Sequence, residues 1–196
     1  MPPTARAAGP TYFTCPHYLA FSAEEIPTNG TEFKCSPPIR SAENREGLWQ
    51  GLLDGTIDMI VSDHSPVPPE FKAGGFAEAW SGISSLELRL PVVWAEASRR
   101  GIGLRHIVRW LCEAPAALAQ LRSGSIELGR RADLVAWDPD AEFVVAPELL
   151  YQRQHLTPYS GVPLRGLVHH TWSAGKMVFA HGRVVQDAKG KLLERV

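Results

Sequence analysis

Two stretches decide the fold: residues 9–18, GPTYFTCPHY, and residues 56–66, TIDMIVSDHSP. Each is a short apolar run that ends in a polar turn containing proline, a pattern that favours a buried strand. We expect residues 31–40, TEFKCSPPIR, to form a third strand and turn of the same kind. Three strands that deliver polar residues at their carboxyl ends predict part of a (β/α)8 barrel, because that fold gathers its chemistry on this face.

The segments beside these strands have helical spacing. Residues 41–55, SAENREGLWQGLLDG, keep leucines on one stripe, and Gly55 supplies a stop. Residues 86–101 and 104–111 carry further apolar stripes and are expected to be covering helices. Pro91 lies inside the first of these, so we expect a kink or a new first turn there. The predicted class is therefore α/β, with about three barrel strands and their helices.

After residue 122 the pattern becomes that of β-structure. Residues 132–138, 142–145 and 164–185 are typical of strands and hairpins, with turns at Gly175 and Gly182. We expect residues 1–122 to form a partial barrel and residues 123–196 a small sheet or partial β-sandwich, with a long loop over residues 145–165. Residues 1–9, MPPTARAAG, resemble the tail of a covering helix, so we expect the original chain to begin earlier.

Composition excludes several classes of function. The 196 residues are 44% hydrophobic with a formal charge of -1, which argues against nucleic-acid binding. No apolar run approaches the roughly 20 residues needed to span a bilayer, and the first ten residues lack the apolar stretch of a signal peptide. We therefore expect a cytoplasmic protein without a membrane partner. The cysteines at positions 15, 35 and 112 form an odd set, so free thiols are expected.

The strand ends carry the candidate site. His17, Ser36 and Asp63 would converge on the carboxyl face of the barrel, with His17 and Asp63 on non-adjacent strands. Imidazole and carboxylate are suitable ligands for zinc or a similar divalent ion. The alternative for His17 is a structural histidine that only makes hydrogen bonds. Cys15 and Cys35 are interpreted as small buried residues rather than nucleophiles.

A family resemblance adds to this interpretation. The strings TCPHYL, FKCSPPIRSAENREGLW, VSDHSP, AWSGISSLELRLPVVW, GRRADLVAWDP and TPYSGVPLRG come in the order found in the cyclic-amide branch of the amidohydrolase superfamily. The chain most resembles the allantoinases, with dihydropyrimidinases (hydantoinases) and dihydroorotases as relatives. The resemblance implies hydrolysis of a small cyclic ureide, allantoin to allantoate in purine catabolism. It also implies two divalent metal ions, with zinc expected and cobalt or manganese as alternatives, and a homo-oligomer such as a tetramer.

The resemblance also implies roles for individual residues. His17 matches a ligand of one metal ion, and Asp63 matches the carboxylate that binds the other ion and moves the proton. Ser36, Ser81 and Gly82 match positions whose main chain contacts the substrate ring. His64 either contacts substrate or is a hydrogen-bonded spectator.

The remaining family ligands, a His-x-His pair, a carboxylated lysine and a further histidine, have no counterpart in this sequence. A complete barrel takes roughly 250 residues, and one histidine with one aspartate cannot complete a two-metal site. Two hypotheses follow: the chain is the C-terminal half of an enzyme that needs a separate N-terminal half, or it is a non-catalytic remnant. In either case we expect the isolated chain to be inactive. His169 and His170 are neighbours on a predicted strand, where one is expected at the surface and the other in the core.

Overall fold

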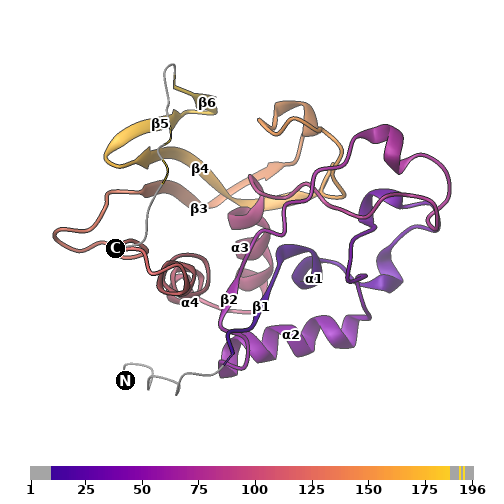
Figure 1. The fold of residues 1–196 in the computed structure, drawn as a ribbon, viewed down its shortest axis with the longest axis horizontal. Helices are drawn as coiled ribbons and strands as arrows, with labels where there is room; N and C mark the ends of the chain where they lie inside the picture. The colour runs from indigo at the N-terminus through magenta and orange to yellow at the C-terminus, as the bar shows by residue number, and fades with distance from the viewer. Residues whose placement is uncertain (1–9, 186–189, 191, 193–196) are drawn as a thin grey trace.

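The computed structural model describes residues 10–185, 190 and 192, so the expectation for residues 1–9 lies outside the described residues (Figure 1). The α-helices are α1 (Pro16–Ala20), α2 (Ala42–Asp54), α3 (Arg89–Arg99), α4 (Leu104–Val108) and α5 (Ala114–Leu118). The strands are β1 (Phe13–Thr14), β2 (Met59–Ile60), β3 (Leu134–Val144), β4 (Pro163–Ser173), β5 (Lys176–Ala180) and β6 (Arg183–Val184). Short 3-10 helices are η1 (Ala23–Glu25), η2 (Thr31–Phe33), η3 (Pro69–Lys72) and η5 (Pro147–Leu149), and η4 (Arg109–Glu113) is a π-helical segment. None of the described helices is long and apolar enough to cross a membrane.

Strands β1 and β2 confirm two of the three expected strands. They pair in parallel, with Phe13 opposite Met59 and Thr14 opposite Ile60. The prediction that the two would be non-adjacent is therefore wrong. Because parallel neighbours end at the same edge, the turns that follow β1 and β2 lie side by side.

The expected strand over residues 31–35 is wrong: this segment contains the 3-10 helix η2. Its backbone carbonyls find partners other than a neighbouring strand. The Lys72 ammonium donates to the carbonyls of Thr31 and Lys34, at 3.0 and 2.9 Å, and the Gly82 N–H donates to the carbonyl of Lys34 at 2.9 Å. Because these hydrogen bonds satisfy the carbonyls of Thr31 and Lys34, the segment does not need a neighbouring strand here.

Helix α2 forms where the leucine spacing predicts it. The Ser41 hydroxyl accepts a hydrogen bond from the N–H of Asn44 at 3.3 Å, which caps the amino end. Gly55 follows the last turn with a positive φ of 81°, a conformation that glycine adopts without steric cost. The Trp49 indole N–H donates to the carbonyl of Leu19 at 3.1 Å, which fixes α2 against α1.

Prolines shape the two predicted covering helices. Helix α3 begins at Arg89, so Pro91 lies in a new first turn, as expected. The helical path that begins at Leu104 continues through η4 into α5, where Pro115 lacks an N–H to donate. A π-helical segment before a proline relieves the clash between its ring and the preceding turn.

The β-rich half forms one antiparallel sheet in the order β3-β4-β5-β6. The two strands expected over residues 132–138 and 142–145 are parts of the single strand β3, whose register shifts between Asp138 and Glu142. The expected hairpin turns at Gly175 and Gly182 are present, since both follow strand ends and have positive φ. The only described strands outside this sheet are β1 and β2, so the described part of residues 123–196 shows one layer of the expected partial β-sandwich.

Helix α3 joins the two parts of the molecule, since it packs against α1 on one side and β4 on the other (Figure 1). The Trp94 indole donates to the carbonyl of Pro139 at 2.8 Å. Gly166 in β4 allows this close approach, because a Cβ there would lie 2.9 Å from the Trp94 ring and 2.7 Å from the Trp137 ring. The core around the helices contains these buried side chains: Leu19, Trp49, Leu52, Ile60, Val93, Trp94, Ala97, Ile102, Ile107, Trp110 and Leu111.

Candidate metal centre

His17 lies in the first turn of α1, directly after β1. Cys15 precedes the helix in an extended conformation, and Pro16 occupies the first helical position, where its fixed φ suits a helix start. The His17 side chain is fully buried, with 0% exposure. The short link between β1 and α1 therefore places the imidazole inside the molecule, at the end of the strand pair.

Asp63 lies in the turn that follows β2. Its φ is 47°, in the left-handed region that aspartate tolerates better than most residues. The carbonyl of Asp63 accepts a hydrogen bond from the Ser65 hydroxyl at 3.3 Å and lies 3.4 Å from His17 Nε2. This turn directs an exposed carboxylate toward the buried imidazole.

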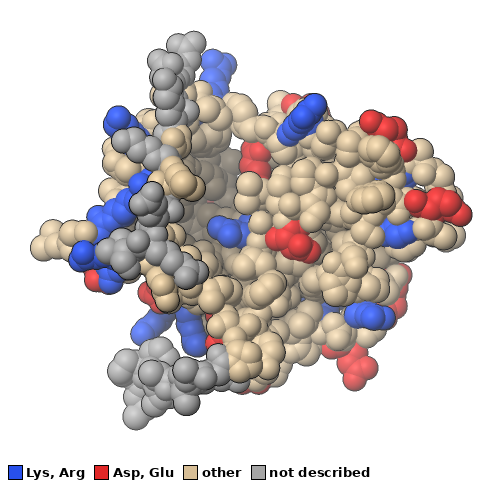
Figure 2. Space-filling view, viewed as in Figure 1, with Lys and Arg blue, Asp and Glu red and all other residues tan. Residues whose placement is uncertain are grey.

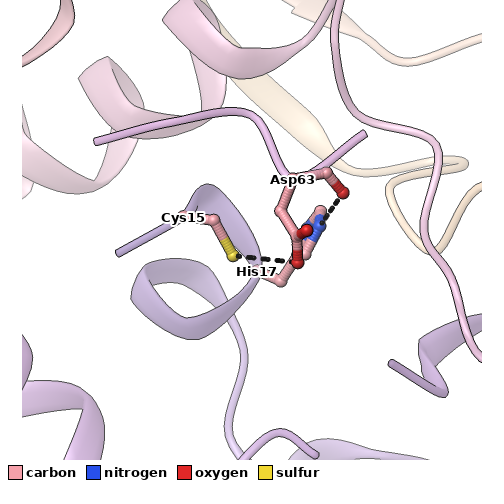
Figure 3. Close-up of side chains that lie close together, drawn as sticks. All are labelled: Cys15, His17 and Asp63. Carbon is pink, nitrogen blue, oxygen red and sulfur yellow. Dashed lines mark hydrogen bonds between the residues drawn. The ribbon is translucent and has the colours of Figure 1, made fainter. Parts of the chain in front are cut away.

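Cys15, His17 and Asp63 form one cluster of possible metal donors (Figure 3). One ligand atom from each residue lies within 4.8 Å of the others, and Cys15 Sγ lies 4.0 Å from Asp63 Oδ2. The expected convergence of His17 and Asp63 is therefore present in the structure. The sequence analysis did not identify Cys15 as a donor, although its position two residues before His17 could have suggested one.

Burial sets the protonation of the two buried donors. Desolvation lowers the pKa of His17 from 6.5 to about 4, so its imidazole is neutral at neutral pH and has a free lone pair. Desolvation also raises the pKa of the Cys15 thiol to about 12. Cys15 is therefore a thiol at neutral pH, which agrees with the expectation that it is not a nucleophile.

Tyr159 orients His17 from the other half of the chain. Its hydroxyl lies 3.0 Å from His17 Nδ1, and its ring packs on Phe21 with centroids 4.8 Å apart. The Thr157 hydroxyl donates to the carbonyl of Ser84 at 2.9 Å and anchors the loop that carries Tyr159. A hydrogen bond at Nδ1 fixes the ring. The other nitrogen, Nε2, lies 3.4 Å from the carbonyl of Asp63, and a metal ion bound at Nε2 would replace that contact. The string TPYSGVP was noted in the sequence, but this contact was not foreseen.

The other predicted site residues are not members of this cluster of donors. Ser36 is exposed, and the loop after it is tied to α1 by the Tyr18 hydroxyl, which donates to the carbonyl of Pro37 at 2.7 Å. Neither Ser36 nor Ser81 makes a side-chain hydrogen bond within the described residues. The N–H of Gly82 already donates to the carbonyl of Lys34, so it is not free for a ligand.

His64 is held by the main chain. Its Nδ1 accepts hydrogen bonds from the N–H groups of Ser85 and Leu86, both at 3.0 Å. The ring is therefore in the tautomer with a proton on Nε2, and burial lowers its pKa. At Nδ1 the geometry is that of the hydrogen-bonded alternative for His64. Nε2 is the ring nitrogen left to contact a ligand.

A cavity lies between the start of α3 and the sheet, and His64, the neighbour of Asp63 in the sequence, is among the residues that line it. Its volume is about 780 Å³, and apolar side chains such as Leu90, Phe143 and Phe179 line it. Figure 2 shows the molecule hollowed between its two parts, with acidic and basic side chains in separate small groups on the rest of this face. Neither His17 nor Asp63 lines this cavity, so its size does not bear on the metal cluster.

The donors present suit one divalent ion. A neutral imidazole and a carboxylate provide the nitrogen and oxygen ligands that zinc and similar ions accept, and Cys15 would add sulfur once the ion displaces its thiol proton. Within the part of the chain that the structure describes, no second group of three such donors occurs. Cys15, His17 and Asp63 therefore fit one ion, and this centre lacks the described ligands for a second ion beside it.

Comparison with known proteins gives the family of the chain. The model of the amidohydrolase family matches residues 17–178, and the chain belongs to that family. Among curated proteins it is similar to allantoinase of Streptomyces avermitilis, with 48% identity over 186 residues, and to allantoinase of Arabidopsis thaliana, with 47% identity over 188 residues. These matches cover 94% and 93% of this chain but 42% and 37% of the two relatives.

A solved structure shows the same likeness. The L-hydantoinase (dihydropyrimidinase) from Arthrobacter aurescens matches with a TM-score of 0.84 and 30% sequence identity. The match covers 89% of this chain and 40% of that chain. The chain therefore spans about two fifths of the length of the proteins it resembles.

Proposed function

We propose that this chain is part of a metal-dependent cyclic amidohydrolase that hydrolyses allantoin to allantoate. One observation carries the proposal: His17 and Asp63, 46 residues apart, come together at the ends of two parallel strands. Polar residues at the carboxyl ends of such strands are where barrel enzymes place their chemistry. The similarity to allantoinases of Streptomyces avermitilis and Arabidopsis thaliana supports allantoin as the substrate.

The proposed architecture is a barrel shared with another polypeptide segment. Residues 1–122 would contribute β1, β2 and their helices, and residues 123–196 would contribute part of a β-sandwich. The likeness to an L-hydantoinase of which this chain covers 40% supports such a division. The other barrel strands would have to supply the further ligands of a two-metal centre, because the cluster of Cys15, His17 and Asp63 provides donors for one ion.

In this proposal His17 and Asp63 hold the metal, and zinc is the first candidate, with cobalt and manganese as alternatives. Divalent ions in such a site lower the proton affinity of water and polarise a carbonyl group. The buried His17 stays neutral and is kept in place by Tyr159, and a metal ion at its Nε2 would replace the 3.4 Å contact with the carbonyl of Asp63. Asp63 is exposed and can accept a proton from water and deliver it to the leaving ring nitrogen.

Ser36, Ser81, Gly82 and His64 remain proposed contacts of the substrate ring. Ser36 is exposed, and Ser81 has a hydroxyl that makes no hydrogen bond within residues 10–185. For Gly82 the free main-chain group would be its carbonyl, since its N–H is engaged. For His64 the available atom is Nε2, since Nδ1 accepts two hydrogen bonds.

A related cyclic amide is the second candidate substrate. The solved structure with a TM-score of 0.84 is named an L-hydantoinase (dihydropyrimidinase), which favours hydantoin or dihydrouracil as the ring. Dihydroorotase activity, which is also the hydrolysis of a cyclic amide, is a further candidate. These rings differ in size and substituents, and the loops around Ser36 and Ser81 would discriminate among them.

Reconstitution tests the proposal. The chain is mixed with the part of the Streptomyces avermitilis relative that it does not cover, in zinc, and turnover of allantoin, hydantoin, dihydrouracil and dihydroorotate is measured. We expect allantoin to be hydrolysed fastest by the mixture, and the chain alone to be inactive. Asp63→Asn should abolish turnover, whereas Asp54→Asn, an exposed aspartate at the end of α2, should not change it.

Three results would argue against the proposal. Turnover by the isolated chain with two bound metal ions would contradict the shared barrel. Faster hydrolysis of dihydroorotate would contradict allantoin as the substrate. A mixture that assembles, by light scattering, but does not turn over any of the four substrates would favour the non-catalytic remnant.

A further inference from the structure

A second pair of metal-binding side chains lies on the antiparallel sheet, outside the candidate metal centre. His170 lies in β4, and His181 lies in the turn between β5 and β6. Their Nε2 atoms are 3.2 Å apart. The ring centroids are 4.5 Å apart, with 78° between the ring planes. Both side chains are accessible to solvent, in contrast to the fully buried His17.

The turn that carries His181 has a defined shape. His181 and Gly182 have positive φ values of 48° and 78°, and Ala180 pairs with Arg183 across them. Two successive residues with positive φ form a type I′ turn, which matches the twist of a two-residue hairpin. The N–H of His181 also donates to the carbonyl of His169 at 2.8 Å. The backbone beside the imidazole is thus fixed to β4.

Tyr151 holds the far side of this turn. Its hydroxyl donates to the carbonyl of Gly182 at 3.0 Å and accepts a hydrogen bond from the N–H of Val184 at 3.3 Å. Its ring packs edge-on against Phe179 in β5. The loop that contains Tyr151 therefore holds the turn in place, which restricts the position of His181 relative to the sheet.

His170 is held from the other side. Its ring stacks on that of Trp172, with centroids 5.6 Å apart and 28° between the planes. Its partners on the neighbouring strands are Ala136 and Ala180, whose small side chains leave the imidazole room to reach His181. The two rings thus approach each other from two separately anchored positions, as a preorganised pair of ligands requires.

The ring geometry favours a shared ligand over a simple hydrogen bond. Two imidazoles joined by a linear N–H···N bond of this length would have centroids about 5.5 Å apart. The observed 4.5 Å shows that the rings are not collinear with the line between the two nitrogens, so a linear hydrogen bond does not describe this pair. A metal ion at the usual distance of about 2.1 Å from each Nε2 would have an N–metal–N angle of about 100°. That angle lies within the range of tetrahedral and octahedral coordination.

We propose that His170 and His181 together bind one transition-metal ion of the Ni²⁺, Cu²⁺ or Zn²⁺ type. Imidazole nitrogen suits these ions, and water would complete the coordination sphere. The site is separate from Cys15, His17 and Asp63, and it does not depend on the proposed hydrolase activity. It has a practical consequence: an ion bound here would be counted in any metal titration of the chain.

The test is a Ni²⁺ titration of the whole chain, followed by NMR of the histidine ring nitrogens and by calorimetry. We expect paramagnetic broadening of the His170 and His181 signals at the lowest Ni²⁺ additions, before that of His155 on an exposed loop. Because the signals report on each histidine separately, binding at His17 is distinguished in the same experiment. Equal broadening of His155 and the pair would overturn the proposal.

Variants provide the second measurement. His170→Gln and His181→Asn should each weaken this binding at least about tenfold, and asparagine is chosen because it tolerates the positive φ of the turn. His169→Gln, at the neighbouring position of β4, is the matched control and should leave the affinity unchanged. Unchanged binding in both test variants would refute the site, as would an equal loss in the control.

Discussion

The buried His17 makes a prediction about the pH dependence of stability. Its pKa is about 4 in the folded chain, because burial disfavours the charged ring, against 6.5 when exposed. Between these two values the unfolded chain binds more protons than the folded chain, so the free energy of unfolding falls as the pH is lowered. The loss from this one group is about 2 kcal/mol at pH 5 and about 3 kcal/mol at pH 4, relative to pH 8.

The assay is urea unfolding at several pH values between 8 and 4, in a chelator so that no metal contributes. Other groups also titrate in this range, so the quantity that matters is the difference between the native chain and His17→Gln, which keeps a polar group near Tyr159. We expect this difference to change by about 2 kcal/mol between pH 8 and pH 5. A ring signal of His17 that titrates near pH 6.5, or a difference that is independent of pH, would refute the reasoning.

Three further substitutions test the packing and the support of the site. Gly166→Ala should lower the free energy of unfolding by about 2 kcal/mol or more, since a Cβ would lie 2.7 Å from a ring carbon of Trp137. Gly47→Ala in α2, with open space around it, should raise the free energy of unfolding by about 1 kcal/mol. Urea unfolding of both variants measures these changes. Tyr159→Phe leaves His17 Nδ1 without its partner and should cost about 1–3 kcal/mol and weaken zinc binding about tenfold, measured by urea unfolding and by calorimetry. Ser41→Ala removes the cap of α2 and should cost about 1 kcal/mol by thermal unfolding; no change would show that the cap hydrogen bond is not formed in solution.

Local patterns were sufficient where the residues that decide the structure are close in sequence. The apolar runs before CPHY and SDH predicted β1 and β2, and the leucine spacing with Gly55 predicted α2 and its end. The strand ends also predicted that His17 and Asp63 would meet, because a barrel gathers the carboxyl ends of its strands on one face, although the two strands are neighbours and were expected to be non-adjacent. These predictions needed only periodicity and turn chemistry.

Where a segment depends on distant partners, the sequence could not settle its structure. Residues 31–35 resemble a strand, but the Lys72 ammonium takes two carbonyl groups there from about 40 positions away, and a 3-10 helix results. Tyr159 reaches His17 across 142 positions, and Cys15 faces Asp63 across 48. Such contacts arise only after the chain has folded, and no local spacing encodes them.

The histidines of β4 show a further limit. The alternation of a strand predicts opposite faces for His169 and His170, with one in the core, yet both side chains are half-buried. This part of the expectation is wrong, since the described sheet is a single layer. Helix α3 packs against β4, and no second β-sheet layer covers His169 and His170, so neither position becomes interior.

The register shift in β3 has a consequence for self-association. Strand β3 is the outermost strand on its side of the described sheet, and an uninterrupted strand of this length would offer its unpaired backbone to another molecule. The segment between Asp138 and Glu142 contains Pro139 and further carboxylates, so the strand offers two short stretches in place of one long template. Proline and charge at such a border are how proteins discourage fibril growth. Replacing this segment with β-branched residues, so that β3 becomes one continuous edge strand, should therefore promote aggregation.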